Sequence, residues 1–443
     1  MKTVGLITEY NPFHNGHQYH IEEAKRLTGA DYAIVVMSGD FVQRGTPAVI
    51  DKYKRTRMAL QGGADLVLEL PVCYATGSAE FFALGAVSLL DKLGITDYLC
   101  FGSESGEISL LQDTVQILKN APVSFSEDLQ GFLRGGYTYP AARANALKRL
   151  AQTLPSVDSQ AISEVITQPN NILAIEYMKA LNSISSPIIP VTIKRIAAQY
   201  HDTDLSAKPA GSSLSSAEGL YDGKRLVQKA ISSATSIRRV IQTQSKISSN
   251  YFEMLQHSVP EHVYQILSEE YGKTYPITEE DFSQIIKYKL LAEDKTVLTE
   301  YMDISSDLAD RMKNLPDYSV NLGELTARIK TRNMTFTRIN RALIHLLLNI
   351  RTEDMNAFSS NGYIFYARIL GIKKEATQLI RTIKKSSTLP LITKVSNASK
   401  QLDSLGMRML SQDIFASHLY QQAICEKYHT ILLNEYRQGI ILA

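Results

Sequence analysis

Two histidines stand three residues apart in the segment His14-Asn15-Gly16-His17, and both could act on a phosphate group. An apolar, β-branched run precedes them at Thr3 to Ile7, and a helical pattern follows from Gly16 to Leu27. Near a helix start, side chains three apart share one face, and the free backbone N–H groups there attract anions. Imidazole donors could then stabilise charge that develops during a transfer reaction. The residues alone leave a second interpretation open, in which both histidines are only exposed turn residues.

The elements that must position these histidines read as strands alternating with helices. Strands that recur roughly every thirty residues, with helical patterns between them, indicate right-handed crossovers and a parallel sheet. We therefore predict an α/β fold with a Rossmann-like parallel sheet, in which ligands bind beyond the carboxyl ends of the strands. After the first strand, the predicted strands are residues 32–37, 65–70, 98–101 and 188–193, and the loops expected to converge on one crevice are 8–17, 38–45 and 102–106.

The second of these loops and the helix after it carry polar groups suited to such a crevice. Asp40 could help to hold a metal ion or position an acceptor. Gln43, Arg44 and Lys52 could meet a phosphate or a carboxylate. For Lys52 and Lys54 we favour a solvated helix face, which is the usual meaning of such lysines.

Three later segments are also candidates. Gly102 to Gly106 follows a strand, where a glycine allows a nucleobase or ribose to approach the backbone, although a plain turn has the same composition. Pro169-Asn170-Asn171 is typical of a helix start, and its asparagines could simply cap that helix. Ser232 to Arg239 predicts another capped helix, whose hydroxyls and Arg238 could converge on one anion.

The composition excludes several classes of protein. At 443 residues, with 44% hydrophobic and 21% charged residues, the chain is long enough for two or three domains with ordinary cores. Its longest apolar run, Leu343 to Ile350, is too short to span a bilayer, and we expect no leader peptide. Cys73, Cys100 and Cys425 have no metal-ligand spacing, so we expect reduced thiols and a cytoplasmic protein.

Basic residues are concentrated toward the C-terminus. Residues 321–443 contain 17 Lys or Arg against 8 Asp or Glu, and the patterns beyond about residue 245 are mostly helical. A solvated surface is the usual meaning of such a run, but the asymmetry favours a polyanion such as nucleic acid. The candidate RNA-binding residues are Arg338, Arg341, Lys373, Lys374, Arg381, Lys384 and Lys385.

Several of these segments together resemble a known family. The segment from Glu9 to His17 resembles the signature of the HIGH-type nucleotidyltransferase superfamily, and the 232–239 run resembles the second signature of its adenylyltransferases, with Ala234 in place of a serine. The lysine-rich second motif of the synthetases is not visible. Adding the segments 37–45, 101–104, 169–173, 194–196, 200–202 and 337–341, the chain resembles the tRNA(Met) cytidine acetate ligase family over most of its length.

This resemblance implies a two-step reaction. Acetate attacks the α-phosphate of ATP to give acetyl-adenylate, and the wobble cytidine of elongator tRNA(Met) then takes the acetyl group as N4-acetylcytidine. It implies catalytic roles for His14 and His17, with Asp40 as a further candidate, and Mg2+ accompanying ATP. It also implies ATP contacts, from which the choice between the two asparagines stays open, at Ile7, Thr8, Glu9, Tyr10, Asn11, Pro12, Phe13, His14, Asn15, Gly16, His17, Gln18, Tyr19, His20, Gly102, Asn170, Asn171, Arg195 and Arg238.

We accordingly divide the chain into an ATP-binding catalytic domain at 1–240, with a helical insertion at about 105–168, and a mainly helical, basic tRNA-binding domain at 241–443. No protein partner and no membrane contact are implied. One alternative is an adenylyltransferase acting on a small mononucleotide or a phosphopantetheine-like substrate, which gives the basic C-terminal half no evident task. A second alternative is an RNA-binding regulator that senses ATP without turning it over, and it leaves the paired histidines unexplained.

Overall fold

The computed structural model describes residues 1–153, 159–195, 233–243, 251–315 and 318–443. At its centre, the described residues form an eight-stranded sheet in the order β10-β8-β5-β2-β1-β6-β7, with β9 paired to β8, while β3 and β4 form a separate hairpin. The strands are β1 (Thr3–Thr8), β2 (Tyr32–Ser38), β3 (Phe41–Val42), β4 (Thr46–Pro47), β5 (Leu66–Leu70), β6 (Tyr98–Ser103), β7 (Ile189–Lys194), β8 (Ala367–Ile372), β9 (Leu391–Ile392) and β10 (Ile441–Leu442).

The five strands β5, β2, β1, β6 and β7 run parallel, so their carboxyl ends share one edge of the sheet. Their inner members are runs of buried aliphatic residues, as expected for strands covered on both faces. These strands fall where the sequence predicted them, and the predicted α/β fold is confirmed.

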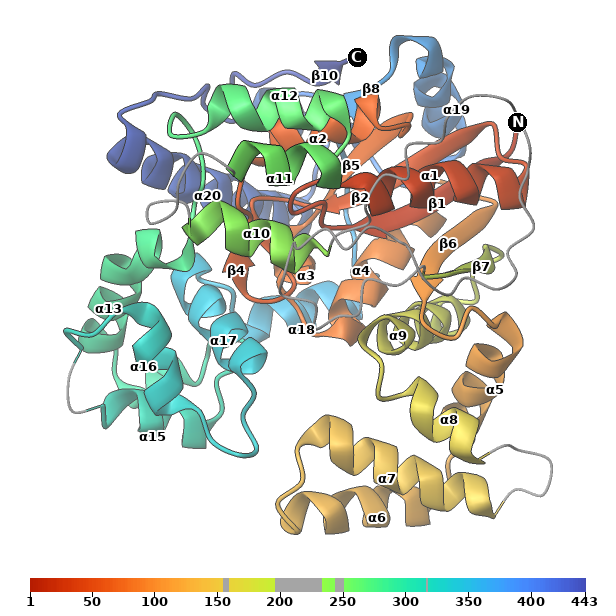
Figure 1. The fold of residues 1–443 in the computed structure, drawn as a ribbon, viewed down its shortest axis with the longest axis vertical. Coiled ribbons are helices and arrows are strands. Elements are labelled where there is room, and N and C mark those ends of the chain that lie inside the picture. Colours follow the sequence, from red (N-terminus) through yellow and green to blue (C-terminus); the bar gives the residue numbers. More distant parts are fainter. Residues whose placement is uncertain (154–158, 196–232, 244–250, 316–317) are drawn as a thin grey trace.

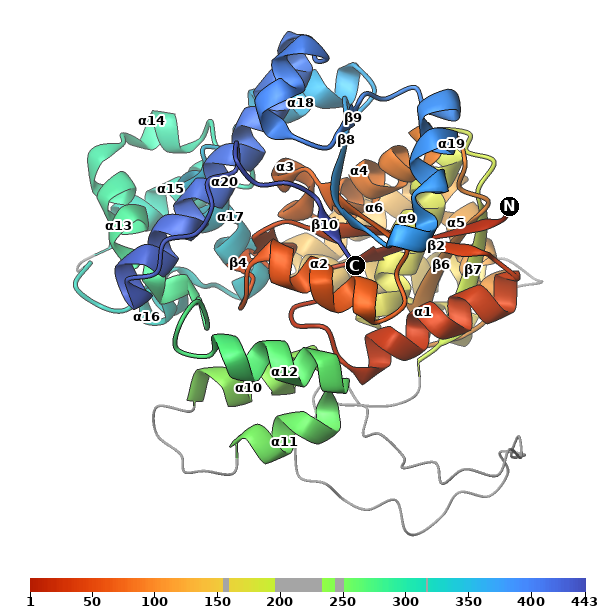
Figure 2. The same cartoon turned by 90° about the horizontal axis from the view of Figure 1, so that it is seen from above.

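Helices cover both faces of the sheet (Figure 1). On one face lie α1 and α2, with α10 to α12 outside them, and on the other lie α3, α4 and α9 (Figure 2). Their bounds are α1 (Asn15–Thr28), α2 (Lys52–Gln61), α3 (Val72–Ala75), α4 (Ala79–Lys92), α9 (Pro169–Ser183), α10 (Ala234–Thr243), α11 (Tyr251–Ser258) and α12 (Glu261–Glu270).

A group of helices between β6 and β7 extends away from the sheet (Figure 1). They are α5 (Ile108–Lys119), α6 (Val123–Arg134), α7 (Tyr139–Gln152) and α8 (Ser159–Val165). At the far end of this group, the turn at Gly136 comes close to Arg332, so a Cβ atom at residue 136 would lie 3.5 Å from the guanidinium Nη1. The group therefore contacts the C-terminal half of the chain across a long distance in sequence.

The C-terminal half contributes both helices and strands. The helices and 3-10 turns are η2 (Glu279–Phe282), α13 (Ser283–Ala292), α14 (Lys295–Leu298), α15 (Ser306–Lys313), α16 (Leu322–Ile329), α17 (Phe336–Leu348), α18 (Thr352–Ser360), η3 (Lys374–Ala376), α19 (Gln378–Ser386), η4 (Val395–Lys400) and α20 (Ser404–Tyr428). Strand β8 pairs antiparallel with β5, and β10 pairs with β8. The sequence did not predict these two strands: β8 carries a glycine and an arginine, which weaken its strand pattern, and β10 has only two residues.

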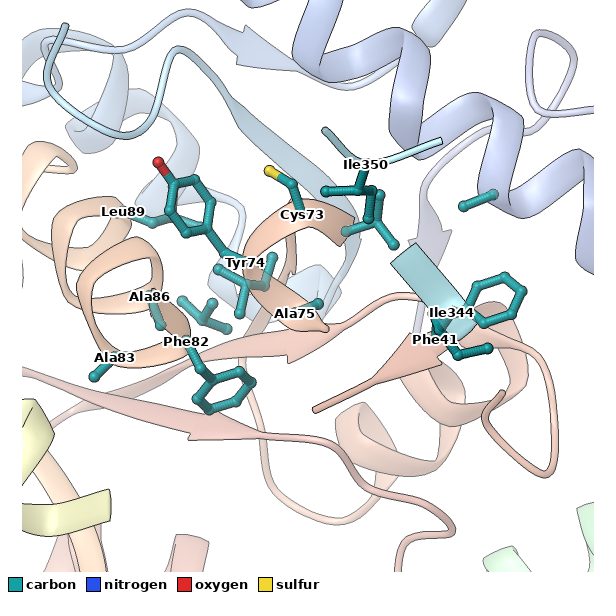
Figure 3. Close-up of a cluster of buried hydrophobic side chains, with 14 of the residues drawn as sticks. Phe41, Cys73, Tyr74, Ala75, Phe82, Ala83, Ala86, Leu89, Ile344 and Ile350 are labelled. Atoms are coloured by element: carbon teal, nitrogen blue, oxygen red, sulfur yellow. The ribbon is translucent and has the colours of Figure 1, made fainter. Parts of the chain in front are cut away.

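One hydrophobic cluster joins the two halves. Figure 3 shows the part in which Tyr74 and Phe82, from α3 and α4, share a core with Ile344 and Ile350 from the C-terminal half. The proposed division near residue 240 stays a prediction, and the sheet itself takes strands from both sides of it. No helix in the described ranges is long and apolar enough to cross a membrane. The predicted 200–202 motif and Ser232 lie outside the described residues.

Candidate active site

The turn between β1 and α1 is closed by the two histidines themselves. His14 is the N-cap of α1, and its Nδ1 accepts a hydrogen bond of 3.1 Å from the backbone N–H of Gly16. In return, Nδ1 of His17 accepts a 3.3 Å hydrogen bond from the backbone N–H of His14. A neutral imidazole that accepts at Nδ1 carries its proton on Nε2. The cap therefore fixes the tautomer of both rings and leaves each with an Nε2–H donor.

The same two rings are stacked, with centroids 3.6 Å apart. Burial, together with smaller contributions from the nearby Arg195 and Arg238, lowers the pKa of His14 to about 3. Burial and the neighbouring His14 hold the pKa of His17 well below its usual range. Burial also lowers the pKa of His20, one turn along the helix, to about 4. All three rings are therefore neutral near pH 7, and the positive charge of the described cavity lining comes from Arg44, Lys194, Arg195 and Arg238.

Ring packing and hydrogen bonds hold the loop before α1 in place. Tyr10 is fully buried with φ of 47°, a left-handed conformation that costs a non-glycine residue roughly 1–3 kcal/mol and often marks functional sites. Its ring packs edge-on against His17 at 4.8 Å. The side-chain Oδ1 of Asn11 accepts a 2.8 Å hydrogen bond from the backbone N–H of Val49. The backbone carbonyl of Asn11 accepts a 2.7 Å hydrogen bond from the Arg238 guanidinium. Arg238 thus connects α10 to this loop.

The opposite wall comes from the ends of β6 and β7 and the start of α9. The Glu104 carboxylate accepts hydrogen bonds from the Asn170 side chain at 2.6 Å and from the backbone N–H of Asn171 at 2.8 Å. The Asn171 side chain accepts in return from the backbone N–H of Glu104 at 2.9 Å. Arg195 crosses Gly102, where a Cβ atom would lie 3.3 Å from its Cγ, and donates to Asn170 at 3.4 Å.

These walls enclose a cavity of about 290 Å³ at the carboxyl edge of the parallel strands. The predicted site residues that line it are Ile7, Thr8, Glu9, Tyr10, Asn11, His14, Gly16, His17, Tyr19, His20, Gly102, Asn170, Arg195 and Arg238. Of the two asparagines between which the sequence left the choice open, Asn170 is on the cavity and Asn171 lies behind it. Pro12, Phe13, Asn15, Gln18 and Asn171 are not among its described lining residues.

One wall of this cavity is apolar and was not predicted from the sequence. Phe82, Phe101, Leu173 and Tyr177 line it, and the Phe101 and Tyr177 rings are 5.7 Å apart. Leu173 and Tyr177 follow Asn170 at helical spacing on α9, so extending the helix from the predicted residue would have found them. The described lining of the cavity thus combines neutral N–H donors, three guanidinium groups, one lysine and an apolar side.

Comparison with known proteins agrees with this geometry. The family model of the HIGH nucleotidyl transferases matches residues 1–220 and 216–434. The tRNA(Met) cytidine acetate ligase of Acetivibrio thermocellus is 39% identical over 443 residues, which cover the whole of both chains. This chain belongs to the tRNA(Met) cytidine acetate ligase family.

Other members of the family agree. The tRNA(Met) cytidine acetate ligase of Thermoanaerobacter sp. (strain X514) is 39% identical over 424 residues, 96% of each chain. The crystal structure of Thermotoga maritima TmcAL bound with alpha-thio ATP superposes with a TM-score of 0.85 at 29% identity, covering 100% of this chain and 99% of that one. The apo form of the same protein gives a TM-score of 0.87 at 30% identity.

Asp40, which the sequence offered as a further catalytic candidate, lies next to the start of α2. Its carboxylate accepts a 2.8 Å hydrogen bond from the backbone N–H of Lys52, and burial raises its pKa to about 6. It is not among the described residues that line the cavity. In this member of the ligase family, the role that the structure gives Asp40 is to hold the start of α2.

The predicted solvent exposure of Lys52 is wrong. We expected a solvated helix face, but its side chain is fully buried, with Nζ 2.8 Å from Glu69 and 3.3 Å from Glu435. Arg368 pairs with the same two carboxylates, at 2.8 Å from Glu69. We call Lys52, Glu69, Arg368 and Glu435 the buried ion cluster. It joins α2, β5, β8 and the C-terminal segment.

The predicted RNA-binding residues fall at two separate places. Arg338 and Arg341 are in the first turns of α17, where Arg341 pairs with Asp303 at 2.9 Å. The backbone of Arg341 lies against Gly45, whose φ is 73° and whose absent Cβ would come within 2.2 Å of the Arg341 nitrogen. This start of α17 is therefore next to the β3–β4 hairpin, whose residues Gln43 and Arg44 line the cavity.

The second basic group lies elsewhere on the ligase fold. Lys373, Lys374, Arg381, Lys384 and Lys385 lie at the end of β8 and on α19. Because Ile372 of β8 pairs with Leu66 at the start of β5, this group is at the amino edge of the parallel strands, opposite the cavity. The structure does not bring the two basic groups together.

Proposed function

We propose that this chain is an ATP-dependent ligase that activates acetate and transfers the acetyl group to the wobble cytidine of elongator tRNA(Met). The observation that carries this proposal is the stacked pair His14 and His17, whose Nε2–H donors share one cavity with Arg195 and Arg238. The relatives that align end to end are named for this activity, and one solved relative binds alpha-thio ATP. A tRNA substrate also suits action in the cytoplasm.

In the first step, a carboxylate oxygen of acetate attacks the α-phosphorus of ATP, and the bond to the β-phosphate oxygen breaks. Acetate is already ionised near neutral pH, so this step needs no general base. Negative charge grows on the leaving pyrophosphate and on the equatorial oxygens. Preorganised donors typically stabilise such charge by about 2.7–4 kcal/mol each, and the histidine N–H groups and the two arginines are of this kind.

Neutral imidazoles suit this task in the free protein. Burial is the main reason that the pKa values of His14 and His17 are lowered, and repulsion from the nearby Arg195 and Arg238 acts in the same direction. As neutral donors, the rings stabilise phosphate without needing a proton from solvent. The positive end of α1 acts on the same region.

In the second step, the exocyclic N4 amine of cytidine attacks the acetyl carbonyl, the bond from that carbon to the AMP phosphate oxygen breaks, AMP leaves and the amine loses one proton to solvent. The amine must reach the mixed anhydride from the open side of the cavity. Gln43 and Arg44, on the hairpin between the cavity and α17, line that approach. The position of Arg338 in the first turn of α17 supports its proposed contact with the RNA backbone.

The described residues do not provide a resident metal site. No group of three or more His, Cys, Asp or Glu side chains in the described ranges is arranged to hold a metal ion. Glu9 is the one carboxylate among the described lining residues, and it accepts a 3.1 Å hydrogen bond from the N–H of Gln43. Mg2+ enters this proposal only as the counter-ion that ATP carries, and no step is assigned to it.

The test is a single incubation. The protein is mixed with ATP, Mg2+, isotopically labelled acetate and tRNA that lacks acetylcytidine, and the nucleosides are then analysed by mass spectrometry. Labelled N4-acetylcytidine in elongator tRNA(Met) is the expected result. Release of pyrophosphate that requires acetate but labels no RNA would leave only the activation step. Turnover of ATP with a mononucleotide in place of acetate would overturn the proposal.

A further inference from the structure

A second cavity of about 470 Å³ lies beside the first, between the β3–β4 hairpin and the helices of the C-terminal half. Its size is within the range of roughly 300–1,000 Å³ that is usual for small-molecule sites. The described residues that line it are Gly45, Gln242, Thr278, Glu279, Glu280, Ile286, Leu322, Gly323, Thr326, Phe336, Asn340, Leu343 and Ile344. Neither the proposed chemistry nor the ATP contacts use any of them.

The two cavities are neighbours through two elements. In the hairpin, Gln43 and Arg44 line the first cavity and Gly45 lines the second. In α10, Arg238 lines the first cavity and Gln242, one turn further on, lines the second. The two cavities therefore lie side by side along the hairpin and α10.

The lining suits a nucleobase better than a phosphate. Phe336 is 48% exposed at the start of α17, so its ring is available for stacking. The amides of Gln242 and Asn340 offer both donors and acceptors. The charged groups of the described lining, Glu279 and Glu280, are carboxylates, which would repel a phosphate but accept hydrogen bonds from base amines.

Cations lie just outside this lining, where the sugar–phosphate backbone would run. Lys330 sits 5.4 Å from the centre of the Phe336 ring, and Arg338 is exposed in the same turn of α17. Arg44 is on the hairpin between the cavities. The arrangement of a base-sized polar and aromatic cavity with a basic rim matches the way proteins hold single-stranded RNA.

We propose that the second cavity binds a nucleobase of the RNA adjacent to the cytidine that enters the catalytic cavity, with Phe336 as its stacking partner. This inference rests on the proposed function. An enzyme that modifies a base must take it out of its stack, at a cost of a few kcal/mol, and the neighbouring base then loses a stacking partner. The Phe336 ring replaces that partner and holds the opened loop.

The decisive comparison uses Phe336→Ala, Phe336→Tyr and the control Phe415→Ala. Phe415 is also an exposed phenylalanine, 41% accessible, but lies on α20 and lines neither cavity. Stacking of a base on an aromatic ring contributes about 1–3 kcal/mol, so Phe336→Ala should raise the KM for RNA about tenfold. Phe336→Tyr and Phe415→Ala should stay near wild type. Acetate-dependent exchange of pyrophosphate into ATP, measured without RNA, should be unchanged in all three.

A matched change in the RNA identifies the contacting base. Anticodon stem–loops are made abasic at either neighbour of the reacting cytidine. At the contacted position, wild type should lose about the same tenfold, and Phe336→Ala should lose nothing further. A KM for RNA that is unchanged in Phe336→Ala, or losses that simply multiply at both positions, would overturn the inference. Wild-type protein without acetate-dependent exchange would instead overturn the proposed function.

Discussion

The histidine pair at the start of α1 and the buried ion cluster are built in opposite ways. His14 and His17 are three residues apart, and each is oriented by a backbone N–H group in the same turn. The ion cluster takes Lys52 and Glu69 from the first part of the chain and Arg368 and Glu435 from the last. A local motif thus sets the candidate chemistry, and a long-range one holds the platform beneath it.

The difference extends to solvent and charge. The histidines are neutral and border a cavity. In the ion cluster, burial and Arg368 oppose the charge of Lys52, but Glu435 and Glu69 outweigh them and raise its pKa above the usual range. Lys52 and Arg368 likewise hold the pKa of Glu435 at about 2 against the effect of burial. Mutation of the ion cluster should therefore change mainly the stability of the fold, and mutation of the histidines mainly the rate of catalysis.

The largest expected effect is on stability, in Lys52→Met. Removing one partner of a buried pair leaves the other charges uncompensated, which typically costs about 3–5 kcal/mol. Lys52 also donates to the Ser417 hydroxyl at 2.6 Å, so α20 should loosen as well. Urea denaturation should show this loss in the free energy of unfolding.

Lys54→Met is the matched control, two residues further along α2. Lys54 is 19% exposed and pairs with Asp51 at 2.7 Å and with Glu270 at 3.4 Å, and because water still reaches these pairs we expect a loss of about 1 kcal/mol. Equal losses in the two variants would show that the buried cluster contributes no more than a surface pair.

The next effect is on catalysis, in His14→Asn and His17→Gln. Asparagine is a good N-cap and glutamine suits the third position of a capping box, so both changes keep α1 closed while removing the Nε2–H donor. Each lost donor should slow acetate-dependent pyrophosphate exchange about 10²- to 10³-fold. The melting temperature should stay close to wild type. A normal exchange rate in both variants would remove the histidines from the mechanism.

The contrast between a local motif and a long-range cluster also explains which features the sequence could predict. The first strand, Gly16 and the two histidines lie within fifteen residues of each other, so their spacing predicted a phosphate-binding helix start. The placement of Lys52 depends on Glu435, 383 positions away, and an isolated lysine on a helix carries no sign of that partner. Strand β8 was missed for the same reason, because its pairing with β5 is fixed by the tertiary fold rather than by its own six residues.

A third prediction concerns pH. The pKa of His14 is about 3 in the folded protein and about 6.5 in an unfolded chain. Between these values the unfolded state binds more protons, so the stability of the fold rises with pH and is lost as pH falls below 6.5. Asparagine does not titrate. From pH 6.5 to 5, the free energy of unfolding of His14→Asn should therefore fall by roughly 1–2 kcal/mol less than that of wild type.

This measurement separates the tautomer argument from its alternative. The same pH series on Phe415→Ala, which removes no titratable group, serves as the control and should follow wild type. If His14→Asn lost stability in parallel with wild type, the ring would be protonated over this range in the folded state. The assignment of His14 and His17 as neutral N–H donors would then be wrong.

The smallest expected effect tests whether the two basic surfaces hold different parts of the RNA. Arg338 is beside the hairpin and the cavities, while Lys384 and Lys385 are on α19 at the opposite edge of the sheet. Arg338→Ala should weaken binding of both a full tRNA and an anticodon stem–loop, lowering the log–log salt slope by up to about one unit. Lys384→Ala with Lys385→Ala should weaken binding of the full tRNA alone, because a short stem–loop bound at the cavity does not extend across the sheet. If the lysine variant changed neither RNA, α19 would be an ordinary solvated surface and the RNA would lie entirely on the cavity side.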